Sequence, residues 1–138
     1  MTADISTVAV GYDGSADSET AVHWAAVLSA SLDARLRIVH AVGLLEESGF
    51  SRVVAPSPDR ALQMARDAGL EAQRVEWLAL QGAPADVLLR ATMPPDAADV
   101  LVVGTRGMAA HSGVILGSTS LAVAERAPVP VVIVPVSQ

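Results

Sequence analysis

The run Val100-Leu101-Val102-Val103 constrains the fold of this chain more than any other stretch. Four consecutive apolar residues suit a strand that is buried on both faces, as strands of parallel sheets are. Gly104 and Gly107 follow, and after nine further residues Gly117-Ser118-Thr119 opens a helical pattern. Because strand-to-helix connections usually take ~2–6 residues, this long one predicts a functional loop. Glycines let the backbone approach a ligand, and a helix N-terminus with hydroxyls attracts phosphate. The stretch therefore predicts a phosphate-binding loop.

Alternating strand and helix patterns cover the rest of the chain. We expect strands at Thr7–Gly11, Leu36–Val42, Gln73–Leu80, Val100–Val103 and Val131–Val136, and helices at Asp17–Leu32, Pro58–Ala68, Pro84–Thr92 and Ser118–Ala127. Such alternation predicts an α/β fold with an open five-stranded parallel sheet and helices on both faces. Neither an internal repeat nor a linker interrupts the pattern, so we expect one domain over residues 1–138.

The ends of these elements carry signals of their own. We expect Asp17 or Ser18 to cap the first helix, and Asp33 to end it in the left-handed conformation. Ser57 is expected to cap the second helix, because a proline follows it. Leu32 belongs to the apolar stripe of the first helix and is expected to face the sheet.

Four other features concern single side chains or a segment. Trp24 and His23 fall off the apolar stripe, and we expect them at the helix flank or in solvent. His40 is expected to be packed and hydrogen-bonded, and Trp77 to lie in the core. The segment Gly43–Ser57 shows no regular pattern, so a lid, an ordered surface loop and a disordered loop all stay open.

Composition narrows the class of protein. No apolar run approaches the ~18–20 residues of a membrane-spanning helix, and an acid stands near the N-terminus where a signal peptide would be basic. With no cysteine, neither a disulfide framework nor a thiol nucleophile is expected. We therefore expect a soluble, cytoplasmic protein without a membrane partner.

Charge excludes further classes. The net charge of −6 argues against nucleic acid as a partner. All nine basic residues are arginine, so the chain lacks the lysine that a P-loop NTPase or a Schiff-base enzyme requires.

Four segments resemble the universal stress protein family, in the order in which that family has them. They are Val8-Ala9-Val10-Gly11-Tyr12-Asp13-Gly14-Ser15, then Ile38-Val39-His40-Ala41-Val42, then the spacing G-x2-G-x9-G-S that starts at Gly104, and finally Ala127-Pro128-Val129-Pro130-Val131-Val132-Ile133-Val134. The loop spacing resembles the ATP-binding branch of that family. The resemblance implies strand order 3-2-1-4-5, which reverses between the first and fourth strands. The glycine-marked connections leave these two strands, which favours this order over 2-1-3-4-5.

The resemblance also implies an ATP site. Backbone amides of the glycines and the hydroxyls at the start of the last helix suit phosphates, whereas Asp13 suits ribose hydroxyls or an adenine edge and Ala41 suits the adenine ring. The residues carried over are Gly11, Asp13, Ala41, Val103, Gly104, Arg106, Gly107, Gly117, Ser118 and Thr119. A structural role at the first helix is the alternative for Asp13, and a loop that binds nothing is the alternative for the glycines.

The loop is poor in cations. Between Arg106 and Glu125 only His111 can carry positive charge, so bound phosphates would depend on amides, on Arg106 and on a possible Mg²⁺. The sequence shows no catalytic constellation and no metal-ligand cluster.

The last strand, Val131–Val136, is apolar enough to aggregate if it formed an open edge. In the family resembled here it pairs with its copy in a partner, so we expect a homodimer through this strand. A covered edge in a monomer is the alternative.

Together these features predict an ATP-binding universal stress protein that regulates a stress response through an unknown protein partner and binds ATP or ADP. An adenine-nucleotide hydrolase with slow ATPase activity is one alternative, although Asp13-Gly14-Ser15 lacks the paired glycines of that class. An interaction module in which nucleotide is dispensable is another. We expect a binding protein rather than an enzyme.

Overall fold

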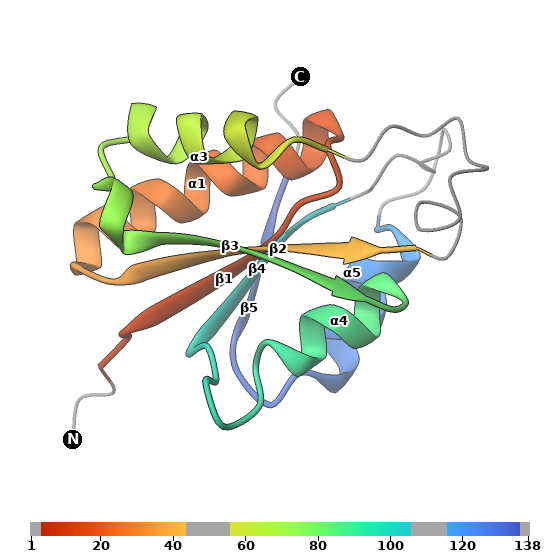
Figure 1. Cartoon of the computed structure of the whole chain (residues 1–138). Coiled ribbons are helices and arrows are strands. Elements are labelled where there is room, and N and C mark those ends of the chain that lie inside the picture. The colour runs from red at the N-terminus through yellow and green to blue at the C-terminus, as the bar shows by residue number, and fades with distance from the viewer. Residues whose placement is uncertain (1–3, 44–55, 106–115, 136–138) are drawn as a thin grey trace.

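The computed structural model describes residues 4–43, 56–105 and 116–135, and a parallel sheet forms its centre (Figure 1). The strands are β1 (Thr7–Gly11), β2 (Arg35–Val42), β3 (Val75–Gln81), β4 (Val100–Gly104) and β5 (Val131–Val134). They lie in the order β3-β2-β1-β4-β5, and every neighbouring pair is parallel. The predicted fold class and the strand order 3-2-1-4-5 are confirmed.

Helices cover both faces of the sheet. The helices are α1 (Ala16–Leu32), α3 (Pro58–Asp67), α4 (Pro84–Arg90) and α5 (Ser118–Arg126), with a short 3-10 turn η1 at Ala72–Arg74. Figure 1 shows α1 and α3 on one side of the strands and α4 and α5 on the other.

Alternate residues of each strand enter different cores. Val8 and Val10 of β1 pack in the cluster that α1 and α3 cover, whereas Ala9 between them packs in the cluster under α4 and α5. This alternation follows from the period of two along a strand. All three side chains are fully buried, which explains why the central strands read as continuous apolar runs.

The start of α1 differs from the prediction. The helix begins at Ala16, and its N-cap is Ser15, whose hydroxyl accepts from the amide of Ser18. Ser15 was not the expected cap, because Asp17 and Ser18 offer equally suitable side chains in the sequence. Since Asp13 already turns the chain before Ser15, the helix begins one residue earlier than expected.

Other helix ends agree with the sequence. Asp33 ends α1 with φ 56°, the left-handed conformation expected of it. Ser57 caps α3 by accepting from the amide of Asp59, and Gly69, just beyond this helix, has φ +99°.

Three boundaries are shifted by two residues from those expected, and several others by one. α4 ends at Arg90 instead of Thr92, because the Thr92 hydroxyl donates to Leu89 O and closes a turn there. β3 begins at Val75, since the residues before it form η1. β5 ends at Val134, because Pro135 is no longer part of the strand, and Val136 lies outside the described residues. The same holds for most of Gly43–Ser57.

Leu32 was wrongly expected to face the sheet: it is 43% exposed, because α1 ends there and the chain turns away. Trp24 and His23 are exposed as expected. Trp77 is partly buried and packs against the core.

His40 is buried and hydrogen-bonded, as expected. Its Nδ1 lies 3.0 Å from the carbonyl oxygen of Tyr12, and its ring stacks on Trp77.

Within the described residues, none of the helices combines the length and the hydrophobicity that crossing a bilayer requires.

Candidate functional site

The site predicted from the sequence centres on the carboxyl end of β1, where the strand order reverses. β1 pairs with β2 on one side and with β4 on the other. Ala41, near the end of β2, therefore lies on one side of the chain that leaves β1, and Gly104, at the end of β4, lies on the opposite side. A ligand that touches both must cross the end of β1, where Asp13 follows.

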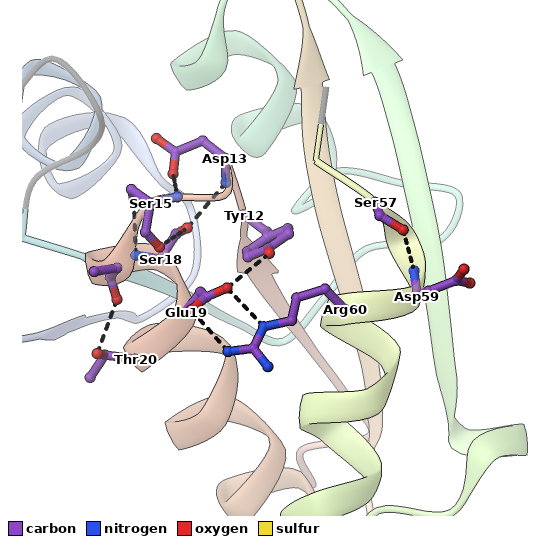
Figure 2. A network of polar contacts seen from close by, with 10 residues as sticks. Tyr12, Asp13, Ser15, Ser18, Glu19, Thr20, Ser57, Asp59 and Arg60 are labelled. Atoms are coloured by element: carbon purple, nitrogen blue, oxygen red, sulfur yellow. Dashed lines mark hydrogen bonds and ion pairs between the residues drawn. The ribbon is translucent and has the colours of Figure 1, made fainter. Parts of the chain in front are cut away.

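Asp13 holds the turn between β1 and α1 (Figure 2). Its Oδ1 accepts from the amide of Ser15 at 2.9 Å, and its own amide donates to Ser18 Oγ at 3.2 Å. The Ser18 hydroxyl donates in turn to Ser15 O at 3.0 Å. These bonds give Asp13 a structural role at the start of α1. The side chain is only partly buried.

The two described ends of the glycine-rich connection are fastened together. The amide of Gly117 donates to Thr105 O at 2.6 Å, and the Ser120 hydroxyl donates to Gly104 O at 2.5 Å. The start of α5 is thereby held against the end of β4. Gly117 is the N-cap of α5 and brings no side-chain cap, so the first-turn amides of this helix receive no hydrogen bond from an N-cap side chain. Ser118 is exposed and Thr119 partly buried.

Close packing accounts for two of the predicted glycines. A Cβ at Gly104 would lie 2.9 Å from the carbonyl oxygen of Asp17, and one at Gly11 would lie 3.1 Å from a methyl group of Leu88. Gly104 therefore lets the first turn of α1 sit directly on β4, and Gly11 makes room for α4. Packing therefore favours glycine at both positions, whatever they contact in a ligand, and most strongly at Gly104, where the neighbouring atoms belong to the backbone.

The remaining predicted residues divide into two groups. Ala41 is partly buried and Val103 is 3% exposed, and both pack on the side of α4 and α5. Arg106 and Gly107 lie outside the described residues, as does His111.

A polar network links the same turn to α3 (Figure 2). The Tyr12 hydroxyl donates to Glu19 Oε2 at 3.3 Å, and Arg60 of α3 donates to both oxygens of Glu19, at 3.1 and 3.3 Å. Burial raises the pKa of Tyr12 above its ordinary value of 10.0, and the neighbouring Glu19 carboxylate raises it further. Tyr12 also meets Trp77 edge-on at 6.1 Å between ring centroids.

Three polar residues at the site were missed from the sequence: Asp17, Thr105 and Ser120. Thr105 Oγ1 donates to Asp17 Oδ2 at 3.4 Å, across 88 positions of sequence. Hydroxyl residues at both ends of the glycine-rich connection were a usable signal for Thr105 and Ser120. No local pattern marks Asp17, because its role depends on packing between distant elements.

Comparison with known proteins identifies the family of this chain. A family model described as "Universal stress protein family" matches residues 5–135. A universal stress protein of Mycobacterium tuberculosis is 36% identical over 143 residues, covering 93% of this chain and 94% of its own. One from Thermus aquaticus is 34% identical over 134 residues, covering 93% and 97%.

A solved universal stress protein in complex with cAMP is also similar in structure. It is 32% identical, has a TM-score of 0.75, and the alignment covers 96% of this chain and 98% of the other. The fold, the sequence identity and the family match agree, and this chain belongs to the universal stress protein family.

Proposed function

We propose that this protein binds an adenine nucleotide, ATP, across the end of β1 and acts as a homodimeric regulator of a stress response. The observation that carries the proposal is the fastening of the α5 start to the end of β4, by Gly117 N to Thr105 O at 2.6 Å. This bond holds the N-terminus of α5, which has no side-chain cap, beside the end of β4. Ligands of such sheets bind beyond the strand ends where the strand order reverses, and a helix N-terminus favours phosphate there. The relative bound to cAMP supports the choice of an adenine nucleotide.

In this proposal each part of the ligand has its own partner. Ala41 faces the adenine ring and Asp13 accepts from ribose hydroxyls. The amides and hydroxyls of Gly117, Ser118 and Thr119 meet the phosphates, because the first turn of a helix carries partial positive charge. The floor of the proposed nucleotide site consists of Gly11, Val103 and Gly104. The phosphates are further bound by Arg106, Gly107 and Mg²⁺.

A cyclic nucleotide is the second candidate. The relative that is 32% identical was solved with cAMP, and cAMP shares the adenine and part of the ribose with ATP. Its phosphate has a single negative charge, so it depends less on cations. Titration with both ligands separates the two candidates.

The test begins with the ligand that the protein carries. Small molecules released from denatured wild-type protein are identified by mass spectrometry, beside a Gly117→Glu variant. Gly117 has φ −70°, which glutamate adopts without strain, so the variant places a negative charge at the phosphate end of a folded protein. Ala97→Glu, an exposed position at the opposite edge of the sheet, is the matched control.

We expect ATP or ADP from the wild type and from Ala97→Glu, and none from Gly117→Glu. Calorimetric titration of emptied protein with ATP, cAMP and GTP then ranks the ligands, and the ratio of ADP to ATP reports any slow hydrolysis. Equal affinity for GTP, or binding unaffected by Gly117→Glu, would remove the assigned site. The dispensable-nucleotide alternative predicts instead that bulky substitutions of Gly117 leave the activity of the protein unchanged.

The homodimer is proposed from the free edge of β5. In the described sheet β5 is the last strand beyond β4. The amide of Leu101 donates to Pro130 O at 3.0 Å, so in a parallel ladder the amide of Val131 points away from β4. Apolar residues fill this edge strand, and a second copy of the strand would satisfy its backbone.

An apolar stripe on α1 borders the same edge. Glu19 faces α3, to which it is joined by Arg60, and at about 100° per residue Leu28 lies roughly half a turn from Glu19. Trp24, Leu28 and Leu32 therefore follow the flank of α1 directed toward β5. Trp24 is 40% exposed and Leu32 43% exposed, so the flank and the edge strand would be covered together in a dimer.

A further inference from the structure

The first turn of α1 is wedged against the end of β4. A Cβ at Gly104 would stand 2.9 Å from Asp17 O and 3.2 Å from Asp17 Cβ, so these two residues are already in contact. The Asp17 side chain is partly buried there. Its position is fixed by backbone packing and does not depend on a flexible surface contact.

The Asp17 carboxylate also contacts Thr105, the residue that follows Gly104. Its Oδ2 accepts from Thr105 Oγ1 at 3.4 Å. Thr105 is the residue whose carbonyl accepts from the amide of Gly117 at 2.6 Å. Two hydrogen bonds therefore connect Asp17 on α1 to the N-cap of α5, through one threonine.

The same turn of α1 also fixes Asp13. Ser15 and Ser18, on either side of Asp17, bond to the side chain and to the amide of Asp13. The first turn of α1 thus touches both the ribose end and the phosphate end of the proposed nucleotide site. Hydrogen bonds of this kind hold the residues that bind a ligand in their correct positions, and small displacements of those residues weaken binding strongly.

We propose that Asp17 is a positioning residue, which acts through Thr105 to hold the start of α5 at the phosphates of the bound nucleotide. This inference rests on the proposed function, and it assigns to Asp17 no contact with the ligand. It predicts that Asp17 and Thr105 affect the part of the affinity that the phosphates contribute, and leave the part due to adenosine unchanged.

The experiment compares ATP with adenosine. Dissociation constants for both are measured by calorimetry on emptied wild-type protein and on Asp17→Ala and Thr105→Val, each of which removes the hydrogen bond. Asp17→Asn and Thr105→Ser keep an acceptor and a hydroxyl, so they are the conservative partners. Asp59→Ala removes an exposed first-turn carboxylate from α3 and is the matched control.

We expect ATP affinity to fall about three- to tenfold in Asp17→Ala and Thr105→Val, as suits the loss of one hydrogen bond. Adenosine affinity should stay constant in both. Asp17→Asn and Thr105→Ser should restore ATP affinity, and the double variant Asp17→Ala/Thr105→Val should be no weaker than either single one.

Other outcomes overturn the inference in distinguishable ways. If wild type binds ATP and both variants keep the wild-type ratio of ATP to adenosine affinity, Asp17 has no positioning role, although the proposed function stands. If both ligands weaken equally, the effect is a general loss of structure and the inference is wrong. If the wild type binds neither ligand, the proposed function fails and this inference falls with it.

Discussion

Gly104 of β4 and Asp17 of α1 are in contact at the centre of the proposed site, with only 2.9 Å between the carbonyl oxygen of Asp17 and the place where a Cβ of residue 104 would lie. The nearest neighbours of that position are a backbone oxygen and a backbone carbon, which cannot rotate away as a side chain can. The glycine therefore sets the distance between the helix and the strand.

Gly104→Ala should lower the free energy of unfolding by about 1–3 kcal/mol, since overpacking against backbone forces the elements apart. Gly11→Ala should cost less, because a Cβ there would meet only methyl groups of Leu88, which can move. Gly43→Ala, where no atom of the described residues lies within 4 Å of the added carbon, is the control. Urea unfolding followed by circular dichroism gives the three values. Equal losses at Gly104 and Gly43 would contradict the close contact.

Tyr12 should make the free energy of unfolding depend on pH in the alkaline range. Burial, with the Glu19 carboxylate beside it, raises the pKa of the phenol in the folded protein above its ordinary value of 10.0, so the folded state holds this proton more tightly than the unfolded chain. The stabilisation is complete below about pH 10 and is lost as the pH rises through the raised value.

The chain allows this to be measured without interference. It has one tyrosine, no cysteine and no lysine, so the absorbance of tyrosinate at alkaline pH reports the ionisation of Tyr12 alone. We expect a titration midpoint above that of the unfolded protein, and Glu19→Gln should move it downward. In Tyr12→Phe the free energy of unfolding should stay level over the same range. A midpoint equal in folded and unfolded protein would refute the prediction.

Much of the architecture could be predicted from the sequence, because the signals involved are local. The apolar runs identify central strands buried on both faces, and Asp33 adopts the left-handed conformation that its short polar side chain tolerates. The start of α1 could not be predicted. Ser15 is one of several polar residues there that can cap a helix, and only the turn made by Asp13 selects it.

Less of the candidate site could be predicted from the sequence. The glycine spacing indicates which backbone segments approach a ligand, yet it does not reveal that Gly11 and Gly104 are needed to admit Leu88 and Asp17. These contacts join elements far apart in the chain, and they depend on how closely helix and sheet pack. The link from Thr105 to Asp17 is invisible to any local pattern for the same reason.

Arg37 should stabilise the amino ends of β2 and β3, at the end of the sheet opposite the proposed site. Its side chain is 12% exposed and forms an ion pair with Glu76 on β3, while Nη1 donates to Asp96 O at 2.5 Å in the segment before β4. One guanidinium thus joins three segments, which an ammonium cannot reproduce.

Arg37→Ala should lower the free energy of unfolding by about 1–2 kcal/mol, because the Glu76 carboxylate and the Asp96 carbonyl lose a charged donor. Arg37→Lys should recover only part of this loss. Arg35→Ala, an exposed arginine of the same strand, is the matched control and should change little. Thermal and urea unfolding measure all three, and equal effects at the two arginines would show that the fork of bonds contributes nothing.

The proposed dimer can be tested on α1 without altering β5 itself. Trp24 and Val27 are similarly exposed, at 40% and 43%, but they occupy different sides of the helix. At about 100° per residue, Trp24 lies on the flank toward β5 and Val27 closer to the solvent-facing side. Trp24→Glu should therefore place a charge in the covered region and weaken association at least tenfold, whereas Val27→Glu should leave it unchanged. Sedimentation velocity over a range of concentrations measures both.

Since neither residue contacts β5 from the core, both variants should unfold like the wild-type monomer. A wild-type protein that stays monomeric at high concentration would remove the dimer, and equal weakening by both substitutions would place the interface on the outer face of α1 instead of at the β5 edge.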